Sequence, residues 1–344
     1  MIFTVKKLCF LEYFSVFLSL FFIGLILSAP AVCAYGAKCG LKISANVLVP
    51  SLFPFAIPVV FLINTPLYQN SKYRLQILFV FSLIGGYPIG AKLISELYKG
   101  GSLSKNTAIK MLPFCVNAGP AFIVIAVGKG ILCSVTVGYI LLFSHTLASV
   151  IIALLFLKKE LTNFNCIKVN KSSFSVCDSI VSSVHTASAA TISISAFVIA
   201  FSVINEYITY YSAAIKPLKY LLYFMEVTSA VAKTKNIYFI SFLLGFAGLS
   251  IWMQVYSVAG ELKAPFIKFA AVRILHGILS TIITAVVFKT FKICVNTISN
   301  GKTILGEAFY SDYALALSLF IMTLLLLINL TSKKHSGNLL KDVV

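Results

Sequence analysis

Residues 85–92, with the sequence GGYPIGAK, interrupt an apolar run that starts near Leu75 and reaches Ile84. Glycine weakens a helix and proline removes one of its hydrogen bonds, so this cluster predicts a break inside a helix. Lipid cannot satisfy the freed backbone groups, which are tolerated at membrane depth only when they are buried in protein or line a water-filled cavity. The stretch therefore predicts a broken helix that is packed against the rest of a membrane protein.

Two other apolar runs contain breakers of the same kind. The run from Leu41 to Ile63 holds three prolines, and the run 108–127 is interrupted at residues 117–120 by the sequence NAGP. Both runs are expected to be kinked or broken, and to be covered by protein rather than by lipid.

The composition places these runs in a membrane. Apolar residues make up 59% of the 344 residues, charged residues make up 11%, and the mean hydropathy is +0.98. A soluble domain has about 45–50% apolar and about 25% charged residues. The sequence therefore predicts an all-α polytopic integral membrane protein, with about eight transmembrane helices and some broken or re-entrant elements.

The net charge of +18 comes from lysines that lie between the apolar runs, such as Lys6, Lys7, Lys158 and Lys159. Basic residues beside membrane spans set the topology, and this spacing does not indicate a nucleic-acid partner. Lysines near both ends of the chain and in the central linker predict that all three regions are cytoplasmic. This orientation requires an even number of crossings.

The chain divides into five expected segments, which comprise two similar halves, a linker and an extra span at each end. They are an N-terminal transmembrane helix at 8–34, a first repeat at 41–157, a basic linker at 158–177, a second repeat at 178–290 and a C-terminal transmembrane helix at 312–331. Residues 82–91 resemble residues 242–250 in the placement of glycine. Broken segments in the two halves of a transporter point to a binding site near the middle of the membrane.

The candidate binding residues lie at the breaks or are polar groups in apolar surroundings. They are Gly86, Tyr87, Pro88, Gly90, Lys92, Asn117, Gly119, Pro120, Glu226 and Gln254. A broken helix exposes N–H and C=O groups that can bind a polar solute or an ion, and a buried asparagine can both donate and accept. Close packing of helices through small residues is the alternative explanation.

Three ionisable residues are candidates for an ion pair or a proton relay. Arg273 and His276 are three residues apart on one helical face, and Glu226 lies between apolar neighbours. A charge at membrane depth is costly and indicates function, although a structural ion pair remains the alternative. His145, alone on an apolar run, is expected to be a packing residue. A polar stripe between Asp178 and Ser195 either lines a cavity or packs against another helix.

The sequence contains no motif of an enzyme, a metal site or a cofactor site. There is no P-loop, GxGxxG, HExxH or GxSxG, and the eight cysteines form no CxxC pair. We therefore expect no catalytic residues, no metal and no cofactor.

Several motifs taken together resemble one known family. They are GYPIGAK at 86–92, FCVNAGP at 114–120, SIVSSVHT at 179–186, EVT at 226–228, and GFAGLSI at 245–251 with Gln254. The combination, spread over residues 45–288, resembles the sporulation integral membrane proteins of the YlbJ type, which carry nucleoside-recognition or Gate domains. Val116 stands where the family pattern has a second asparagine, and Ala247 stands where it has a glycine.

The resemblance implies a role in forming the endospore, and in particular its cortex, within the cell or forespore membrane of a spore-forming bacterium. Together with the broken helices, it leads us to expect two Gate-like repeats that form a transporter or channel for a small polar solute, either nucleoside-like or an ion, although the resemblance itself supplies no substrate. A non-transporting membrane scaffold for cortex assembly is the alternative. Expected partners are the lipid bilayer, the solute, and other sporulation membrane proteins or a second copy of the chain. No nucleic acid is expected.

Overall fold

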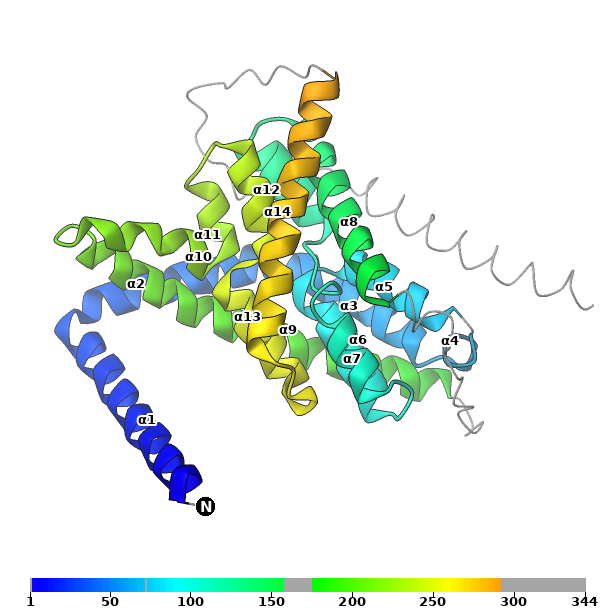
Figure 1. Cartoon of the computed structure of the whole chain (residues 1–344), viewed down its shortest axis with the longest axis horizontal. Helices are drawn as coiled ribbons and strands as arrows, with labels where there is room; N and C mark the ends of the chain where they lie inside the picture. The colour runs from blue at the N-terminus through cyan, green and yellow to red at the C-terminus, as the bar shows by residue number, and fades with distance from the viewer. Residues whose placement is uncertain (1, 72, 158–174, 292–344) are drawn as a thin grey trace, which may run out of the picture.

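The computed structural model describes residues 2–71, 73–157 and 175–291, and these residues form helices and no strand (Figure 1). The first half contains α1 (Ile2–Ser28), α2 (Pro30–Ile43), a π-helical segment η1 (Ser44–Leu48), α3 (Val49–Ile63), α4 (Pro66–Gln69), α5 (Arg74–Gly85), α6 (Tyr87–Lys99), α7 (Lys105–Met111), a π-helix η2 (Ala121–Ile131) and α8 (Val135–Leu157). The second half contains α9 (Val176–Tyr211), a 3-10 turn η3 (Lys216–Tyr220), α10 (Leu222–Met225), α11 (Val227–Ala232), α12 (Ile237–Phe246), α13 (Gly248–Ala259), a 3-10 turn η4 (Gly260–Leu262) and α14 (Phe266–Phe291).

The described helices confirm a polytopic membrane fold. Four of them are long and apolar enough to cross a bilayer: α8, α9, α12 continued by α13, and α14. A fifth span arises if the bent pair α1 and α2 counts as one. The expected C-terminal span at 312–331 and most of the linker at 158–177 lie outside the described residues. The expectation of about eight crossings therefore stays a prediction.

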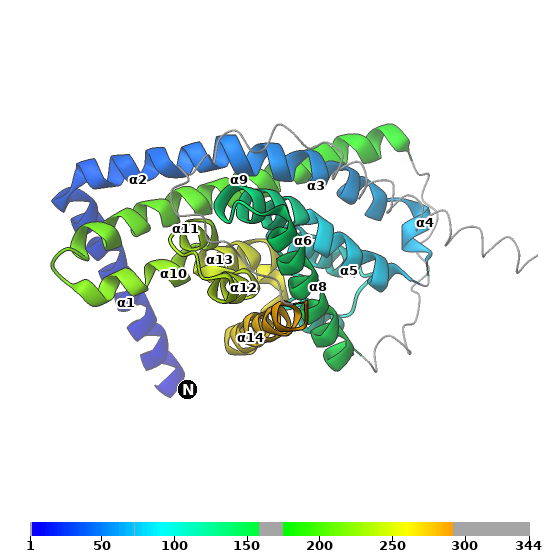
Figure 2. The same cartoon turned by 90° about the horizontal axis from the view of Figure 1, so that it is seen from above.

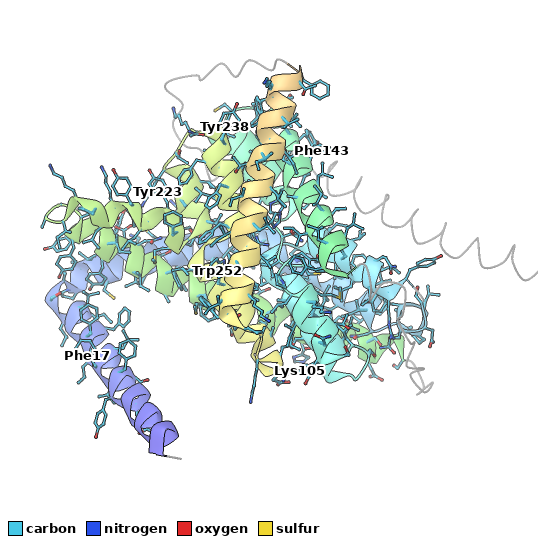
Figure 3. The ribbon with its side chains drawn as sticks, in the orientation of Figure 1. Phe17, Lys105, Phe143, Tyr223, Tyr238 and Trp252 are labelled. Atoms are coloured by element: carbon cyan, nitrogen blue, oxygen red, sulfur yellow. The ribbon has the colours of Figure 1, made fainter. Side chains whose placement is uncertain are left out.

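The expected first span at 8–34 is not one straight helix. The chain turns by 99° between Glu12–Ser28 and Pro30–Asn46. Ala29, at the corner, has φ −149° and ψ 70°, because the residue before a proline is disfavoured in the α conformation. Figure 3 shows Phe17 on α1 well away from the bundle, and its side chain is exposed. Phe143 on α8 and Tyr238 on α12 also point outward and offer apolar surface to lipid.

A long helical arm runs along one side of the molecule. Helices α2 and α3, joined by η1, lie side by side with α9 over most of its length (Figure 2). The close approach is made by glycines: a Cβ on Gly36 would lie 2.7 Å from the Cα of Val203, and one on Gly40 would lie 2.6 Å from the Cα of Ile199. Gly36 meets Val203, whereas Gly40, which comes later in the chain, meets the earlier residue Ile199. Helices α2 and α9 are therefore antiparallel. Small residues that let backbones touch are the usual glue of membrane helices.

Replacing Gly40 by alanine is expected to force the arm apart and to lower the free energy of unfolding by about 1–3 kcal/mol, the usual cost of overpacking. Chemical unfolding in detergent micelles measures the change. Gly24→Ala is the matched control, because a Cβ on Gly24 meets nothing within 4 Å. Equal stability of the two variants would show that α2 and α9 are not in backbone contact.

The upright helices run crosswise to this arm. In Figure 1, α8, α12 and α14 stand across the direction of α2 and α9. A buried set of hydroxyls joins α12 to α14, where Ser241 lies 2.8 Å from Ser280 and 2.9 Å from Thr284. Gly245 faces Gly277 so closely that a Cβ on the first would lie 2.5 Å from the Cα of the second. Polar bonds and small residues thus position α14, which carries two of the candidate residues.

Candidate functional site

The predicted break at residues 85–92 is present, and it lies against the second predicted break. Gly86 has φ 86° and ψ 174°, which favours glycine, and it separates α5 from α6. A Cβ on Gly119 would lie 3.5 Å from the Cα of Gly86 and 3.3 Å from the carbonyl oxygen of Ile84. Pro120 is the N-cap residue of η2. The two broken segments of the first half therefore meet backbone to backbone.

The second half has two breaks that meet in the same way. One separates α10 from α11 at Glu226, and the other separates α12 from α13 at Ala247, whose φ is 73°. A Cβ on Gly248 would lie 3.5 Å from the Cα of Glu226 and 3.4 Å from the carbonyl oxygen of Met225. An alanine in the left-handed region is strained by about 1–2 kcal/mol, which surrounding contacts must offset.

Trp252 supplies one of those contacts. Its indole N–H donates to the carbonyl oxygen of Phe246 at 2.8 Å and satisfies a group at the end of α12. The ring is buried on α13 and meets Phe269 of α14 edge to face, with centroids 5.9 Å apart (Figure 3). This packing fixes the direction in which α13 leaves the break.

A hydrogen bond links the breaks of the two halves. The hydroxyl of Tyr87, the first residue of α6, donates to the carbonyl oxygen of Leu244 at 2.9 Å. Leu244 lies in the last turn of α12, just before Ala247. Both residues are buried. The candidate residue Tyr87 therefore contacts the end of α12, next to the second-half break.

Arg273 lies at the centre of a buried polar cluster, which we call the polar centre: Pro113, Val116, Asn117, Ala118, His145, Arg273 and His276. The Nη1 group of Arg273 donates to the carbonyl oxygens of Pro113 at 3.0 Å and Val116 at 2.6 Å. It also lies 3.0 Å from Nδ1 of His276. These bonds tie α14 to the non-helical segment between α7 and η2. The segment needs such partners because residues outside a helix leave carbonyl groups unpaired.

The partners of the two histidines assign their tautomers. Nε2 of His276 is 3.0 Å from the carbonyl oxygen of His145, so Nε2 must carry a proton and Nδ1 accepts from Arg273. Nε2 of His145 accepts from the backbone N–H of Ala118 at 3.1 Å. His145 in its neutral form therefore carries its proton on Nδ1, for which the structure gives no partner. The rings lie 4.5 Å apart.

Asn117, a member of the polar centre, is fully buried. Its side-chain amide donates to the carbonyl oxygen of Phe114 at 2.7 Å, and the hydroxyl of Ser149 donates to the same oxygen at 2.8 Å. The amide oxygen of Asn117 has no partner. The side-chain N–H of Asn117 thus bonds within the non-helical segment, while its side-chain oxygen is an acceptor without a partner.

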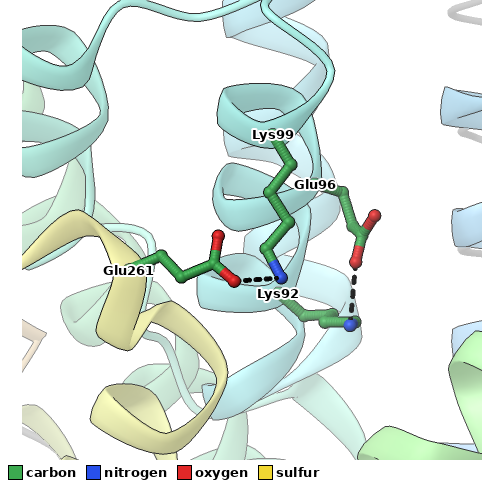
Figure 4. A network of polar contacts seen from close by, with 4 residues as sticks. All are labelled: Lys92, Glu96, Lys99 and Glu261. Carbon is green, nitrogen blue, oxygen red and sulfur yellow. Dashed lines mark ion pairs between the residues drawn. The ribbon is translucent and has the colours of Figure 1, made fainter.

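The expected partnership of Glu226 with Arg273 is not formed. Both carboxylate oxygens of Glu226 accept backbone N–H groups, of Thr228 at 2.9 Å and of Ser229 at 2.7 Å, so the side chain caps α11. Within the described ranges, the ion pairs are Lys92–Glu96 at 2.8 Å and Lys99–Glu261 at 3.0 Å (Figure 4). A carboxylate at a helix start satisfies two unpaired donors and matches the helix dipole, so it does not need a cationic partner.

Replacing Glu226 by alanine is expected to lower the free energy of unfolding by about 0.5–2 kcal/mol, the cost of a lost helix cap. Glu226→Gln keeps one amide oxygen as an acceptor and should cost less than the alanine variant. Thermal unfolding of the purified variants measures both. A larger loss for glutamine than for alanine would contradict the capping role.

The remaining candidates are dispersed. Lys92 pairs with Glu96 one turn along α6, in a partly exposed position. Gln254 is buried on α13, where its amide N–H donates to Ser250 at 3.2 Å. The polar stripe on α9 is exposed at Asp178 and His185 and buried at Thr191, so its role as cavity lining or as helix packing stays a prediction. The sequence-based expectation for His145 missed its hydrogen bond to Ala118, which involves a backbone group and leaves no mark in the sequence.

No cluster of three potential metal-ligating side chains occurs in the part of the chain that the structure describes. The polar centre is instead built from backbone carbonyls, imidazoles and one guanidinium. Such a set offers hydrogen bonds to a solute and contains no nucleophile paired with a base.

Comparison with known proteins identifies one relative. The sporulation integral membrane protein YlbJ of Bacillus subtilis (strain 168) is 22% identical over 334 aligned residues, which cover 78% of this chain and 81% of YlbJ. The chain is thus similar to a sporulation integral membrane protein of the YlbJ type over most of its length. No family model matches the chain, and no solved structure matches it. This similarity agrees with the apolar helices and with the motifs at the two first-half breaks.

Proposed function

We propose that this YlbJ-type protein is a carrier or channel for a small polar solute, nucleoside-like or an ion, that is needed for endospore cortex formation. The observation that carries the proposal is the polar centre, which lies where broken helices of both halves converge. Polar groups at membrane depth are costly, and they are usually retained for binding or transport. Broken helices that meet at one point are also the construction that transporters use.

We further propose that the halves are two Gate-like repeats, at 41–157 and 178–290, related through their paired breaks. In each half one broken helix touches the other: Gly86 lies against Gly119, and Glu226 lies against Gly248. This pairing relates the Ala-Gly step at 118–119 to the Ala-Gly step at 247–248. It differs from the correspondence between residues 82–91 and 242–250 that glycine placement suggests. Movement of one repeat against the other would open the centre to each side in turn.

The orientation that goes with this proposal places both ends of the chain in the cytoplasm. Basic residues cluster near both termini and in the linker, and such clusters stay on the cytoplasmic side of a membrane. The protein would act in the cell membrane or the forespore membrane, and it would work without a cofactor or a catalytic step.

A non-transporting scaffold for cortex assembly is the second candidate. It is favoured by the closure of the polar centre, where the side chains of Asn117, His145, Arg273 and His276 are fully buried. A scaffold would need these hydrogen bonds only to hold α14 against the non-helical segment. In that case the polar centre would never meet water or solute. Other sporulation membrane proteins or a second copy of the chain would then be its partners.

An uptake assay separates the two candidates. The purified protein in liposomes is offered nucleosides, divalent cations and inorganic phosphate, alongside the variants Asn117→Ala and Glu226→Gln. The exposed His185→Ala is the matched control. Saturable uptake that is lost in Asn117→Ala and kept in His185→Ala supports a carrier. No uptake of any of these solutes, together with normal spore cortex in cells that produce only the Asn117→Ala protein, would favour the scaffold.

A further inference from the structure

Arg273 is a buried cation that has no acidic partner. Its side chain is fully buried, and the two ion pairs of the described ranges, Lys92–Glu96 and Lys99–Glu261, do not include it. Glu226, the carboxylate expected to face it, is held by the backbone of α11. Both neighbouring histidines are neutral by their hydrogen bonds, so the polar centre carries one uncompensated positive charge. Burying a charge without a counter-charge is expensive unless something else stabilises it.

The hydrogen bonds of Arg273 are confined to one of its three nitrogens. All three acceptors lie around Nη1: the carbonyl oxygens of Pro113 and Val116, and Nδ1 of His276. Nε and Nη2 have no partner, although they are buried. The N–H groups of Nε and Nη2 point side by side and form the edge of the guanidinium that binds a carboxylate or a phosphate with two parallel hydrogen bonds.

The same cluster offers one more unpartnered donor and little to repel an anion. The proton on Nδ1 of His145 is buried and unpaired, and the His145 ring lies 4.5 Å from that of His276, which itself touches Arg273. No carboxylate of the described residues lies within ion-pair distance of the guanidinium. A charged hydrogen-bonding edge with unused donors is better matched by an oxyanion than by a cation.

We infer that the Nε and Nη2 edge of Arg273 binds an oxyanion, which is a carboxylate or a phosphate group of the transported solute. That this solute is transported rests on the proposed function. Binding of the oxyanion does not itself require transport. Nη1 meanwhile keeps the non-helical segment in place. One side chain therefore both builds the polar centre and selects an anionic ligand. An anion would supply the missing counter-charge, so the ligand should also stabilise the protein.

Binding of inorganic phosphate and of succinate to the purified full chain, in a neutral detergent and by calorimetry, tests the inference. Uridine serves as the neutral comparison. Phosphate or succinate should bind at least about tenfold more tightly than uridine, since charge-assisted hydrogen bonds are about twice as strong as neutral ones. Arg273→Lys keeps the charge but lacks the two-pronged edge, and it should weaken anion binding by about tenfold or more. Adding phosphatidylglycerol micelles distinguishes a lipid headgroup, which would compete, from a free anion.

A second variant protects the test against misfolding. In His145→Gln the amide reaches the place of Nε2 and can still accept from Ala118, while the proton on Nδ1 is lost. This variant should fold and bind the anion more weakly. Equal binding of phosphate, succinate and uridine, or unchanged anion binding in both variants, would overturn the inference and leave water as the occupant. Anion binding without uptake would keep the inference and reject transport.

Discussion

Replacement of Arg273 by methionine is expected to lower the free energy of unfolding by about 3 kcal/mol or more, because three buried acceptors lose the donor Nη1. Methionine fills a similar volume but donates nothing. The carbonyl oxygens of Pro113 and Val116 and the Nδ1 atom of His276 would then be buried without partners, each at a cost of about 1–3 kcal/mol. Chemical unfolding in detergent micelles, followed by the fluorescence of the single tryptophan, Trp252, measures the loss.

Arg273→Lys is the matched control for this effect. Its ammonium group can replace some of the bonds of Nη1, so it should lose less stability than methionine while it binds an oxyanion poorly. A methionine variant as stable as the native protein would mean that Arg273 does not hold the segment between α7 and η2. It would also contradict the claim that the hydrogen bonds of Nη1 organise the polar centre.

Replacement of Gly90 by alanine is expected to destabilise the protein by about 3 kcal/mol or more, the upper part of the range for overpacked cores. A Cβ at this position would overlap the carbonyl oxygen of Cys115, and it would lie 2.7 Å from the Cβ of Ser82. Two of the three nearest atoms, the carbonyl oxygen and the carbonyl carbon of Cys115, belong to the backbone, so no side-chain rotation can relieve the overlap. Thermal unfolding and the yield of folded protein measure the effect.

The prediction for Gly90 concerns the sign of the change in the free energy of unfolding as well as its size. Alanine favours a helix over glycine by about 1 kcal/mol, so an uncrowded site would become more stable. Gly100→Ala, ten residues further on at the end of α6, is the control, because its nearest atom would be the carbonyl oxygen of Glu96 at 3.4 Å. A Gly90→Ala protein at least as stable as Gly100→Ala would show that α6 does not pack on the segment around Cys115.

The first-half breaks could be predicted because glycine and proline carry local signals. Gly86 adopts a positive φ, and residues 117–120 lie outside any helix, as their sequences indicate. The break at Ala247 was harder to predict, since the run from Ile237 to Tyr256 reads as one apolar span. Its alanine adopts a left-handed conformation that only tertiary contacts enforce, among them the bond from Trp252 to Phe246.

The polar centre could be predicted only in part for a related reason. Helical periodicity places Arg273 and His276 on one face, and they do form a hydrogen bond. Periodicity cannot show which group on another element they meet. The guanidinium meets backbone carbonyls, which every residue possesses, and not Glu226. Long-range hydrogen bonds between side chains and backbone could therefore not be predicted from the sequence. The hydrogen bond between side chains one helical turn apart could be predicted.

The reactivity of Cys115 tests the central claim, that the polar centre opens to both sides of the membrane, most directly. The thiol is fully buried in the segment that Arg273 binds. A protein in which the other cysteines are replaced by alanine is reconstituted in vesicles and treated from each side with a membrane-impermeant maleimide. The account predicts slow labelling from both sides, with protection by the transported solute. No labelling from either side until the protein is unfolded would contradict it and favour a sealed scaffold.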